Sequence, residues 1–296
     1  MSTRHPIIVV TGSSGSGTTT VKNTFDQIFR REGITAATIE GDAFHRYDRA
    51  GMKAAIAEAE AAGNRHFSHF SPEANLLDDL GEVFAEFGES GKGRTRHYVH
   101  DEREAEMYGA MPGTFTDWEP LPADCDVLFY EGLHGAAKTP TVDLSQYGDL
   151  KIGVVPVINL EWIQKLHRDM NARHHSEEVI TETILRRMPD YVHTITPQFS
   201  RTDINFQRVP TIDTSNPFTA TEIPTNDESM VVIQIANLQK IKPDFRALLE
   251  MLQGSFMSRP DTLVVPAGKN VFAMELLLAP AIGRLMERRN RLRGAS

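Results

Sequence analysis

The sequence contains a single cysteine, Cys125, among its 296 residues. A lone cysteine cannot form a disulfide within the chain, and it cannot supply a cluster of thiolate metal ligands. It also excludes a switch in which two thiols of one chain are oxidised together. We therefore expect neither dithiol regulation nor a cysteine-based metal centre.

Long apolar runs and an excess of positive charge are missing as well. No stretch of about 18 consecutive apolar residues occurs, so no transmembrane helix is predicted. Residues 1–6 lead into a short apolar segment without the apolar core of a signal peptide, and we expect a cytoplasmic protein. The net charge of −9 excludes a general basic surface, so neither nucleic acid nor an anionic membrane is an expected partner.

The sequence does contain an alternation of β and α patterns. An apolar, β-branched run at 6–11 precedes a Gly/Ser turn, a helical pattern at 18–31 and a second strand at 35–40. Runs at 127–130 and 150–157 lack alternation, as is typical of strands buried on both faces of a sheet. Further helices are predicted at 50–62, 72–87, 160–173, 176–188, 243–252 and 271–291, and further strands at 206–212, 230–235 and 262–265.

This order predicts an α/β fold: a mixed, mostly parallel sheet with helices on both faces and ligands at the carboxyl ends of its strands. We expect one domain spanning residues 1–296, without internal repeats. Residues 88–122 are rich in glycine, proline, arginine and histidine, and predict an irregular excursion or a small inserted strand pair. Residues 160–188 are expected to form a lid.

The turn after the first strand has the frame of a phosphate-binding loop, except that Thr18 stands where a lysine is usual. Its glycines let backbone N–H groups converge on phosphate oxygens, and the following helix adds partial positive charge. A plain connecting turn is the alternative. The expected ATP-phosphate site comprises Gly12, Ser13, Ser14, Gly15, Ser16, Gly17, Thr18 and Thr19, with Thr19 also a magnesium ligand.

Two carboxylates follow predicted strands. Asp42 comes after the second strand and is a candidate general base, although aspartate is also a preferred helix N-cap. If the segment after it is helical, His45 and Arg49 lie one turn apart and can hold a substrate phosphate. Glu131 follows the strand at 127–130, where a carboxylate can reach the magnesium ion of a nucleotide.

The cations missing from the loop are expected from residues 160–188. Lys165, Asp169 and Arg173 recur at helical spacing, with Arg168 beside them, so they line one stripe if the segment is helical. A surface ladder of ion pairs is the alternative. His100 is either a partner of substrate hydroxyls or an ordinary loop histidine.

Histidine pairs with the spacing H-x-x-H are weak evidence for zinc because no cysteine supports them. These pairs are His66 with His69 and His97 with His100.

Taken together, the segments GSSGSGT, EGDAFHRYDR, FYEGLHG, KIGVVPVINLEWIQK and DTSNPF resemble the phosphoribulokinase family in its shorter bacterial form. The resemblance implies a P-loop fold like that of nucleotide monophosphate kinases, with a seven-stranded mixed sheet. It also implies ATP- and Mg²⁺-dependent phosphorylation of the C1 hydroxyl of ribulose 5-phosphate, by a homo-oligomer that is often an octamer. The family's phosphate loop likewise lacks the lysine.

The resemblance also implies roles for individual residues. Asp42 is the base, Asp169 a second essential carboxylate near the metal, and Lys165 a cation for the transferred phosphoryl. Glu131 lies near magnesium. The phosphosugar is bound by His45, Arg49, Arg168 and Arg173, and further candidate cations are Arg186 and Arg187.

Bacterial members of this family are often activated by NADH through an arginine-lined site. Arg31 and Arg259 correspond to two of its arginines, but Gln234 stands where the third is expected. Because a guanidinium that contacts an effector phosphate is lost, we predict weak or absent activation by NADH.

Two other functions remain open from the sequence. One is a related P-loop kinase for another sugar phosphate or for a nucleoside such as uridine. The other is a catalytically silent nucleotide-binding protein, which the missing loop lysine favours and the retained carboxylates oppose.

Overall fold

The computed structural model describes residues 4–13, 17–173, 176–218 and 222–294. Its centre is an eight-stranded sheet in the order β2-β5-β1-β6-β7-β8-β10-β9. The first five of these strands are parallel to one another, and β8 turns antiparallel to β7. The strands are β1 (Ile7–Gly12), β2 (Ala36–Glu40), β5 (Val127–Gly132), β6 (Leu150–Val155), β7 (Ile204–Pro210), β8 (Ser229–Gln234), β9 (Phe256–Arg259) and β10 (Thr262–Pro266).

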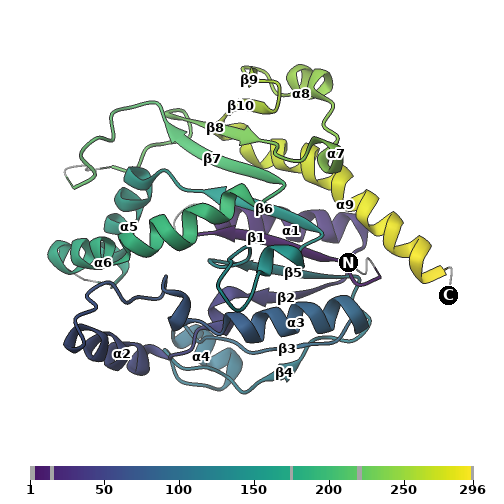
Figure 1. The fold of residues 1–296 in the computed structure, drawn as a ribbon. Coiled ribbons are helices and arrows are strands. Elements are labelled where there is room, and N and C mark those ends of the chain that lie inside the picture. The colour runs from purple at the N-terminus through teal and green to yellow at the C-terminus, as the bar shows by residue number, and fades with distance from the viewer. Residues whose placement is uncertain (1–3, 14–16, 174–175, 219–221, 295–296) are drawn as a thin grey trace.

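Helices cover both faces of this sheet (Figure 1). One core packs α1 and α9 against the side chains of Ile8, Val10 and Phe129, and the other packs α3 against Val9 and Tyr130. Alternate residues of one buried strand thus belong to opposite cores, which explains the unbroken apolar runs. The helices are α1 (Thr18–Glu32), α2 (Arg49–Ala61), α3 (Leu77–Ser90), α4 (Glu102–Tyr108), α5 (Ile158–Arg173), α6 (Glu177–Asp190), α7 (Leu238–Ile241), α8 (Phe245–Met251) and α9 (Asn270–Gly294).

The predicted α/β fold with a mostly parallel sheet is confirmed. The seven strands implied by the family resemblance are one too few, since β9 adds a short antiparallel edge strand beside β10. Within residues 88–122, β3 (Arg94–Thr95) and β4 (Glu119–Pro120) form a separate two-stranded sheet, and α4 lies between them in the sequence. Among the described helices, none is both long and apolar enough to cross a membrane.

The predicted helix at 72–87 is wrong at its start. Residues 72–74 form a single 3₁₀ turn, Asn75 is extended, and α3 begins only at Leu77. The cause is tertiary, because Asn75 forms an isolated antiparallel bridge with His45 and is thereby held out of the helix. This bridge connects the segment before α3 to the segment after β2, beside the candidate site.

Candidate active site

The phosphate-binding turn joins β1 to α1 at the carboxyl end of the sheet. Gly17 has φ +105°, a left-handed conformation that disfavours any side chain, and it precedes the first turn of α1. Ser13 is buried, and its hydroxyl donates a 2.9 Å hydrogen bond to Oε2 of Glu161. Ser14, Gly15 and Ser16 lie outside the described residues.

Glu161 was not singled out by the sequence analysis, although it connects the loop to α5. Its carboxylate also accepts a 3.2 Å hydrogen bond from the hydroxyl of Tyr191. Burial raises the pKa of Glu161, and the bonds from Ser13 and Tyr191 offset only part of that rise. The charges of Lys165 and Arg187 act on the same carboxyl, so both cations lie near the phosphate loop. That α5 and α6 supply the positive charge missing from the loop stays a prediction.

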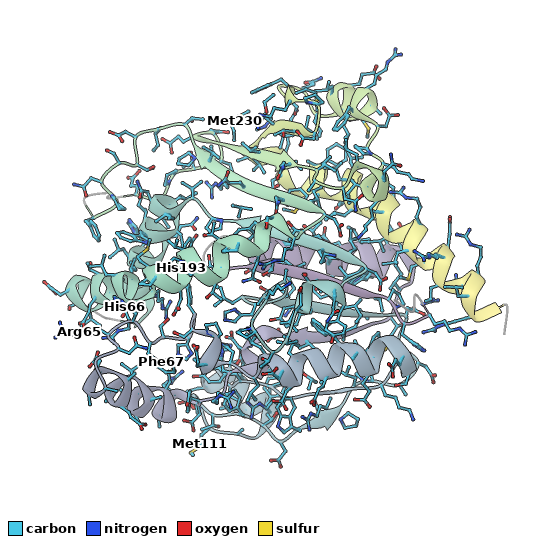
Figure 2. The ribbon with its side chains drawn as sticks, in the orientation of Figure 1. Arg65, His66, Phe67, Met111, His193 and Met230 are labelled. Atoms are coloured by element: carbon cyan, nitrogen blue, oxygen red, sulfur yellow. The ribbon has the colours of Figure 1, made fainter. Side chains whose placement is uncertain are left out.

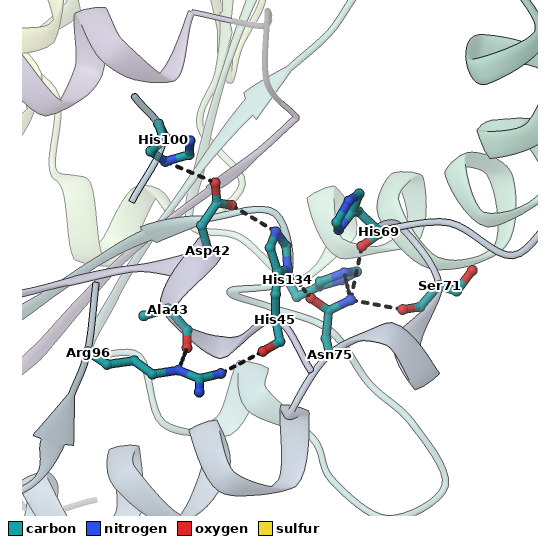
Figure 3. A network of polar contacts seen from close by, with 9 residues as sticks. All are labelled: Asp42, Ala43, His45, His69, Ser71, Asn75, Arg96, His100 and His134. Atoms are coloured by element: carbon teal, nitrogen blue, oxygen red, sulfur yellow. Dashed lines mark hydrogen bonds and ion pairs between the residues drawn. The ribbon is translucent and has the colours of Figure 1, made fainter. Parts of the chain in front are cut away.

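Asp42 lies in the first turn of the 3₁₀ helix Gly41–Phe44, directly after β2. Its Oδ1 is 3.1 Å from Nε2 of His45, and its Oδ2 is 3.5 Å from Nε2 of His100 (Figure 3). Burial would raise the pKa of Asp42, but the hydrogen bond and charge of His45, together with His100, lower it to about 2. The carboxylate is therefore ionised at neutral pH, as a general base must be.

The alternative that Asp42 is a helix N-cap is wrong. The N-cap of α2 is Asp48, whose side chain accepts a hydrogen bond from the N–H of Gly51, and Asp42 contacts histidines instead. The helical spacing proposed for His45 and Arg49 is wrong: His45 ends the 3₁₀ helix with ψ 139°, and α2 begins only at Arg49. The guanidinium of Arg49 donates a 3.0 Å hydrogen bond to the carbonyl of His100.

The segment that carries Asp42 is fixed from outside by Arg96. The guanidinium donates two 2.7 Å hydrogen bonds, from Nε to the carbonyl of Ala43 and from Nη2 to the carbonyl of His45 (Figure 3). The same group lies over the rings of Phe115 and Trp118. A residue of the excursion thus orients the candidate base.

Glu131 lies at the end of β5, opposite Glu40 of β2 and Val10 of β1 in the strand registers. The two strand ends approach closely because they carry Gly41 and Gly132: a Cβ added to Gly41 would lie 2.8 Å from the Cα of Gly132. Burial raises the pKa of Glu131, the Thr18 hydroxyl offsets part of that rise, and the charge of Glu40 adds to it. A carboxylate in this position beside a phosphate loop is suited to a divalent cation.

A lysine of α1 also lies beside these carboxylates. Lys22, one turn beyond Thr18, forms an ion pair with Glu40. Burial would lower the pKa of Lys22, but Glu40 and Glu131 raise it. Lys22 could not be found from the sequence, because helical spacing alone does not reveal which strand end it faces.

Several predicted residues are placed only in part. Thr19, Arg168, Asp169 and Arg173 belong to described helices, but their side chains lie outside the described residues. Arg187 is near the site, since its charge acts on His45 and Glu161. Arg186 instead pairs with Glu60 of α2, at 2.6 Å, and with Glu182.

The histidine pairs do not form a zinc site in the part of the chain that the structure describes. No group of three or more histidine, cysteine, aspartate or glutamate side chains is arranged there to hold a metal ion. His66 lies on the loop after α2, next to α6 (Figure 2), whereas His69 packs on the ring of His45 with centroids 4.8 Å apart.

Two of the three effector candidates, Gln234 and Arg259, lie at the opposite edge of the sheet from β2. Gln234 at the end of β8 and Arg259 at the end of β9 both pair with Thr262 of β10. Gln234 accepts a 3.3 Å hydrogen bond from Asn205. Arg31, at the end of α1, forms a 3.0 Å ion pair with Glu275 of α9.

A cavity of about 330 Å³ adjoins the start of α1. Gly17 and Thr20 form one wall, and Pro156, Arg208 and Asn270 contribute to the others. Among the described residues, the Oδ1 atom of Asn270 and the Nε atom of Arg208 are buried without a hydrogen-bond partner. Buried polar atoms of this kind are suited to a ligand with its own donors and acceptors.

Comparison with known proteins identifies the family. A sequence model of the Phosphoribulokinase / Uridine kinase family matches residues 7–215. The chain belongs to this family.

Similarity within the family extends over the full chain. The phosphoribulokinase of Nitrobacter vulgaris is 62% identical over 97% of this chain and 99% of its own. The chromosomal phosphoribulokinase of Cupriavidus necator is 60% identical over 98% of this chain and 99% of its own. Among solved structures, phosphoribulokinase from Rhodobacter spheroides superposes with a TM-score of 0.89 at 57% identity, covering 98% of this chain and all of that one.

Proposed function

We propose that this chain is an ATP-dependent kinase that phosphorylates the C1 hydroxyl of D-ribulose 5-phosphate, giving ribulose 1,5-bisphosphate and ADP. The observation that carries the proposal is the position of Asp42: an ionised carboxylate between His45 and His100, one strand away from Glu131 and two strands away from the phosphate loop. Full-length identity of 57–62% to proteins named phosphoribulokinase supports the acceptor.

In the proposed reaction Asp42 accepts the proton of the C1 hydroxyl. The hydroxyl oxygen forms a bond to the γ-phosphorus as the bond from that phosphorus to the β,γ-bridging oxygen breaks, and ADP leaves with the bond's electron pair. Catalysis of such a transfer consists mainly of positioning and electrostatic stabilisation. The backbone N–H groups at the start of α1, Lys165 and Arg187 are the groups of this chain that offset the negative charge.

The residues present fit a magnesium ion. Glu131 offers a carboxylate whose pKa is raised by burial and by the charge of Glu40, against the Thr18 hydroxyl and the Lys22 ammonium, and Thr19 and Asp169 would be the further oxygen ligands. A bound magnesium ion would neutralise charge on the β- and γ-phosphate oxygens.

The acceptor's phosphate is assigned to cations on the Asp42 side of the site. Arg49 lies at the start of α2 with its guanidinium on the carbonyl of His100, and Arg168 and Arg173 are on α5. His45 contributes positive charge, and His100 is placed to contact substrate hydroxyls. A phosphorylated acceptor suits this set of cations better than an uncharged nucleoside does.

We assign the base and ribose of ATP to the cavity beside α1. It touches Gly17 and Thr20, so a nucleotide whose phosphates lie on the loop can extend into it. Its unpartnered Asn270 and Arg208 atoms offer polar contacts to the base.

The wider properties rest on the family resemblance. We propose a cytoplasmic homo-oligomer, built from dimers and up to an octamer, that shows weak or absent activation by NADH because of Gln234. Ribulose 5-phosphate and Mg-ATP are its expected small-molecule partners.

The acceptor is tested by measuring ADP release in a coupled assay, with and without Mg²⁺. Ribulose 5-phosphate is compared with ribose 5-phosphate, with uridine and with no acceptor. Fast, magnesium-dependent turnover with ribulose 5-phosphate alone is the expected result. Preference for another acceptor would leave a P-loop kinase but overturn the substrate, and tight ATP binding without turnover would indicate a silent nucleotide-binding protein.

A further inference from the structure

Asn75 is a buried polar residue beside the candidate base that the proposed reaction leaves without a role. It retains 3% of its surface and lies opposite His45 in an isolated antiparallel bridge. Two backbone hydrogen bonds hold this bridge, from Arg46 to Ala74 and from Leu76 to Phe44. The bridge sets the Asn75 side chain against the imidazole of His45.

The orientation of the Asn75 amide follows from its neighbours. Its nitrogen lies 3.0 Å from the carbonyl oxygen of His69, 2.8 Å from that of Ser71 and 3.1 Å from Nε2 of His134 (Figure 3). The two carbonyl oxygens only accept hydrogen bonds and are the nearer partners, so they take the two amide hydrogens. A flipped amide would set its oxygen against two carbonyl oxygens. The Oδ1 atom therefore faces Nδ1 of His45, at 2.8 Å.

This orientation decides the protonation of His45. An amide oxygen can only accept, so Nδ1 of His45 carries a hydrogen. The other ring nitrogen, Nε2, is 3.1 Å from Oδ1 of Asp42. A neutral ring would present a lone pair to that carboxylate, whereas an imidazolium donates to both neighbours at once.

We propose that Asn75 is a positioning residue for phosphoryl transfer: its amide oxygen holds His45 in the doubly protonated form, and the resulting imidazolium keeps Asp42 ionised. The proposal deepens the function assigned above and rests on it. The catalytic group remains Asp42. Asn75 acts only through His45.

The charges around His45 agree with this assignment. Burial would lower the pKa of His45, but Asp42 and Asn75 raise it, against the charge of Arg187 on α6. The neighbouring rings of His69 and His134 are neutral, because burial and the positive charge of His45 lower the pKa of each to about 3. His45 is thus the one protonated histidine of the buried group, and its charge is directed at Asp42, which His100 also faces.

A consequence concerns the acceptor's phosphate. Both N–H groups of His45 are engaged, one by Asn75 and one by Asp42. His45 therefore attracts the phosphate by charge rather than by a hydrogen bond. Direct hydrogen bonds to the phosphate are left to the arginines.

The test is Asn75→Leu, a buried replacement of similar size that cannot accept a hydrogen bond. Without the amide oxygen that accepts its hydrogen bond, the imidazolium of His45 is less stable. The pH at which kcat/KM for the sugar phosphate falls on the alkaline side of its pH profile (the alkaline limb) should therefore decrease by about one to two units. Should this variant fail to fold, Asn75→Ala removes the same amide and is compared in its place.

A second readout needs no substrate. The raised pKa of His45 adds stability that is complete below its ordinary value of 6.5 and is lost as the pH rises through the folded value. The Tm difference between the unaltered protein and Asn75→Leu should therefore be largest near about pH 6 and should narrow towards about pH 10. Because the Tm measurement uses no substrate, it tests the role of Asn75 even if the proposed substrate is wrong.

Asn205→Leu is the matched control. Asn205 is also a buried amide. It donates hydrogen bonds of 2.9 Å to the carbonyl of Phe199 and 3.3 Å to the side chain of Gln234, and it accepts one of 2.7 Å from Thr202, none of which titrates. Asn205→Leu should lower Tm by an amount that does not depend on pH, and it should not move the alkaline limb of kcat/KM. In a His45→Gln background, Asn75→Leu should lose its pH-dependent effect. An unmoved alkaline limb together with a pH-independent Tm difference would overturn the inference.

Discussion

Asp42 directly follows β2 and Glu131 lies at the end of the neighbouring parallel strand β5, yet the structure shifts their pKa values in opposite directions. Burial raises the pKa of both carboxyls. Asp42 has histidines at 3.1 and 3.5 Å, and its pKa falls to about 2. Glu131 has the Thr18 hydroxyl, the Lys22 ammonium and the carboxylate of Glu40 nearby; these partners do not offset the effect of burial, and its pKa rises.

The comparison shows that partners, rather than depth, decide what each carboxylate can do. On the Asp42 side of the site the carboxylate faces two histidines, is ionised and can accept a proton. The Glu131 side carries excess negative charge and is ready to accept a cation. The proposed acceptor region and the proposed nucleotide region thus lie side by side at the carboxyl ends of β2 and β5.

Asp42→Asn should have the largest effect. An amide cannot take the hydroxyl proton, and general-base catalysis contributes about 10²–10⁴-fold, so kcat should fall by about that factor. Coupled ADP release measures it, and an unchanged circular dichroism spectrum checks folding. Near-normal turnover would remove Asp42 from the role of base.

Glu131→Gln should separate activity from stability. Loss of a metal ligand should lower kcat by about 100-fold. A carboxyl with a raised pKa opposes folding at pH above that pKa, so at pH 7 the ligand-free variant should melt higher than the unaltered protein, and the gain should fade as the pH falls through the raised pKa towards the ordinary glutamate value of 4.5. Glu89→Gln, an exposed change on α3, is the control. A lower Tm at pH 7 would contradict the assignment.

Arg49→Gln probes the acceptor region alone. Losing charged hydrogen bonds to a phosphate should raise KM for ribulose 5-phosphate by about 10- to 100-fold while KM for ATP stays within about twofold. Steady-state kinetics with each substrate varied in turn gives both values. An equal rise in KM for both substrates would contradict the division of the site into two regions.

Lys22→Met probes the nucleotide region with a smaller change. The Lys22 ammonium offsets part of the negative charge of Glu40 and Glu131. Without this ammonium, the pKa of Glu131 should rise further. Protons should then compete more strongly with Mg²⁺ below about pH 6, so the half-saturating Mg²⁺ concentration should rise about threefold. Lys22→Arg keeps the charge and should show no such change; an equal rise in both variants would point to shape rather than charge.

Gln234→Arg lies outside both regions and should have the smallest effect on basal turnover. We expect NADH to activate the unaltered enzyme weakly or not at all, and the added guanidinium to strengthen the response. Titration of NADH into both proteins measures the difference. Strong activation of the unaltered enzyme would show that Gln234 does not limit effector binding.

Much of this site could be predicted from the sequence because its carboxylates follow strands. Asp42 and Glu131 come after apolar runs, and parallel strands place their carboxyl ends together. Asn75, Glu161 and Lys22 could not be found this way, since their roles depend on contacts with residues far apart in the sequence. The same contacts explain the misplaced start of α3, where the bridge from Asn75 to His45 overrides a helical pattern.

The most direct test of the central comparison is an infrared pH titration of the carboxyl groups in the ligand-free protein, with Asp42→Asn and Glu131→Gln assigning the two signals. We expect Asp42 to be ionised already at about pH 4, and Glu131 to remain partly protonated above the ordinary glutamate value of 4.5. If both carboxyls titrate together, or if Glu131 ionises first, then partners do not set their charges as described.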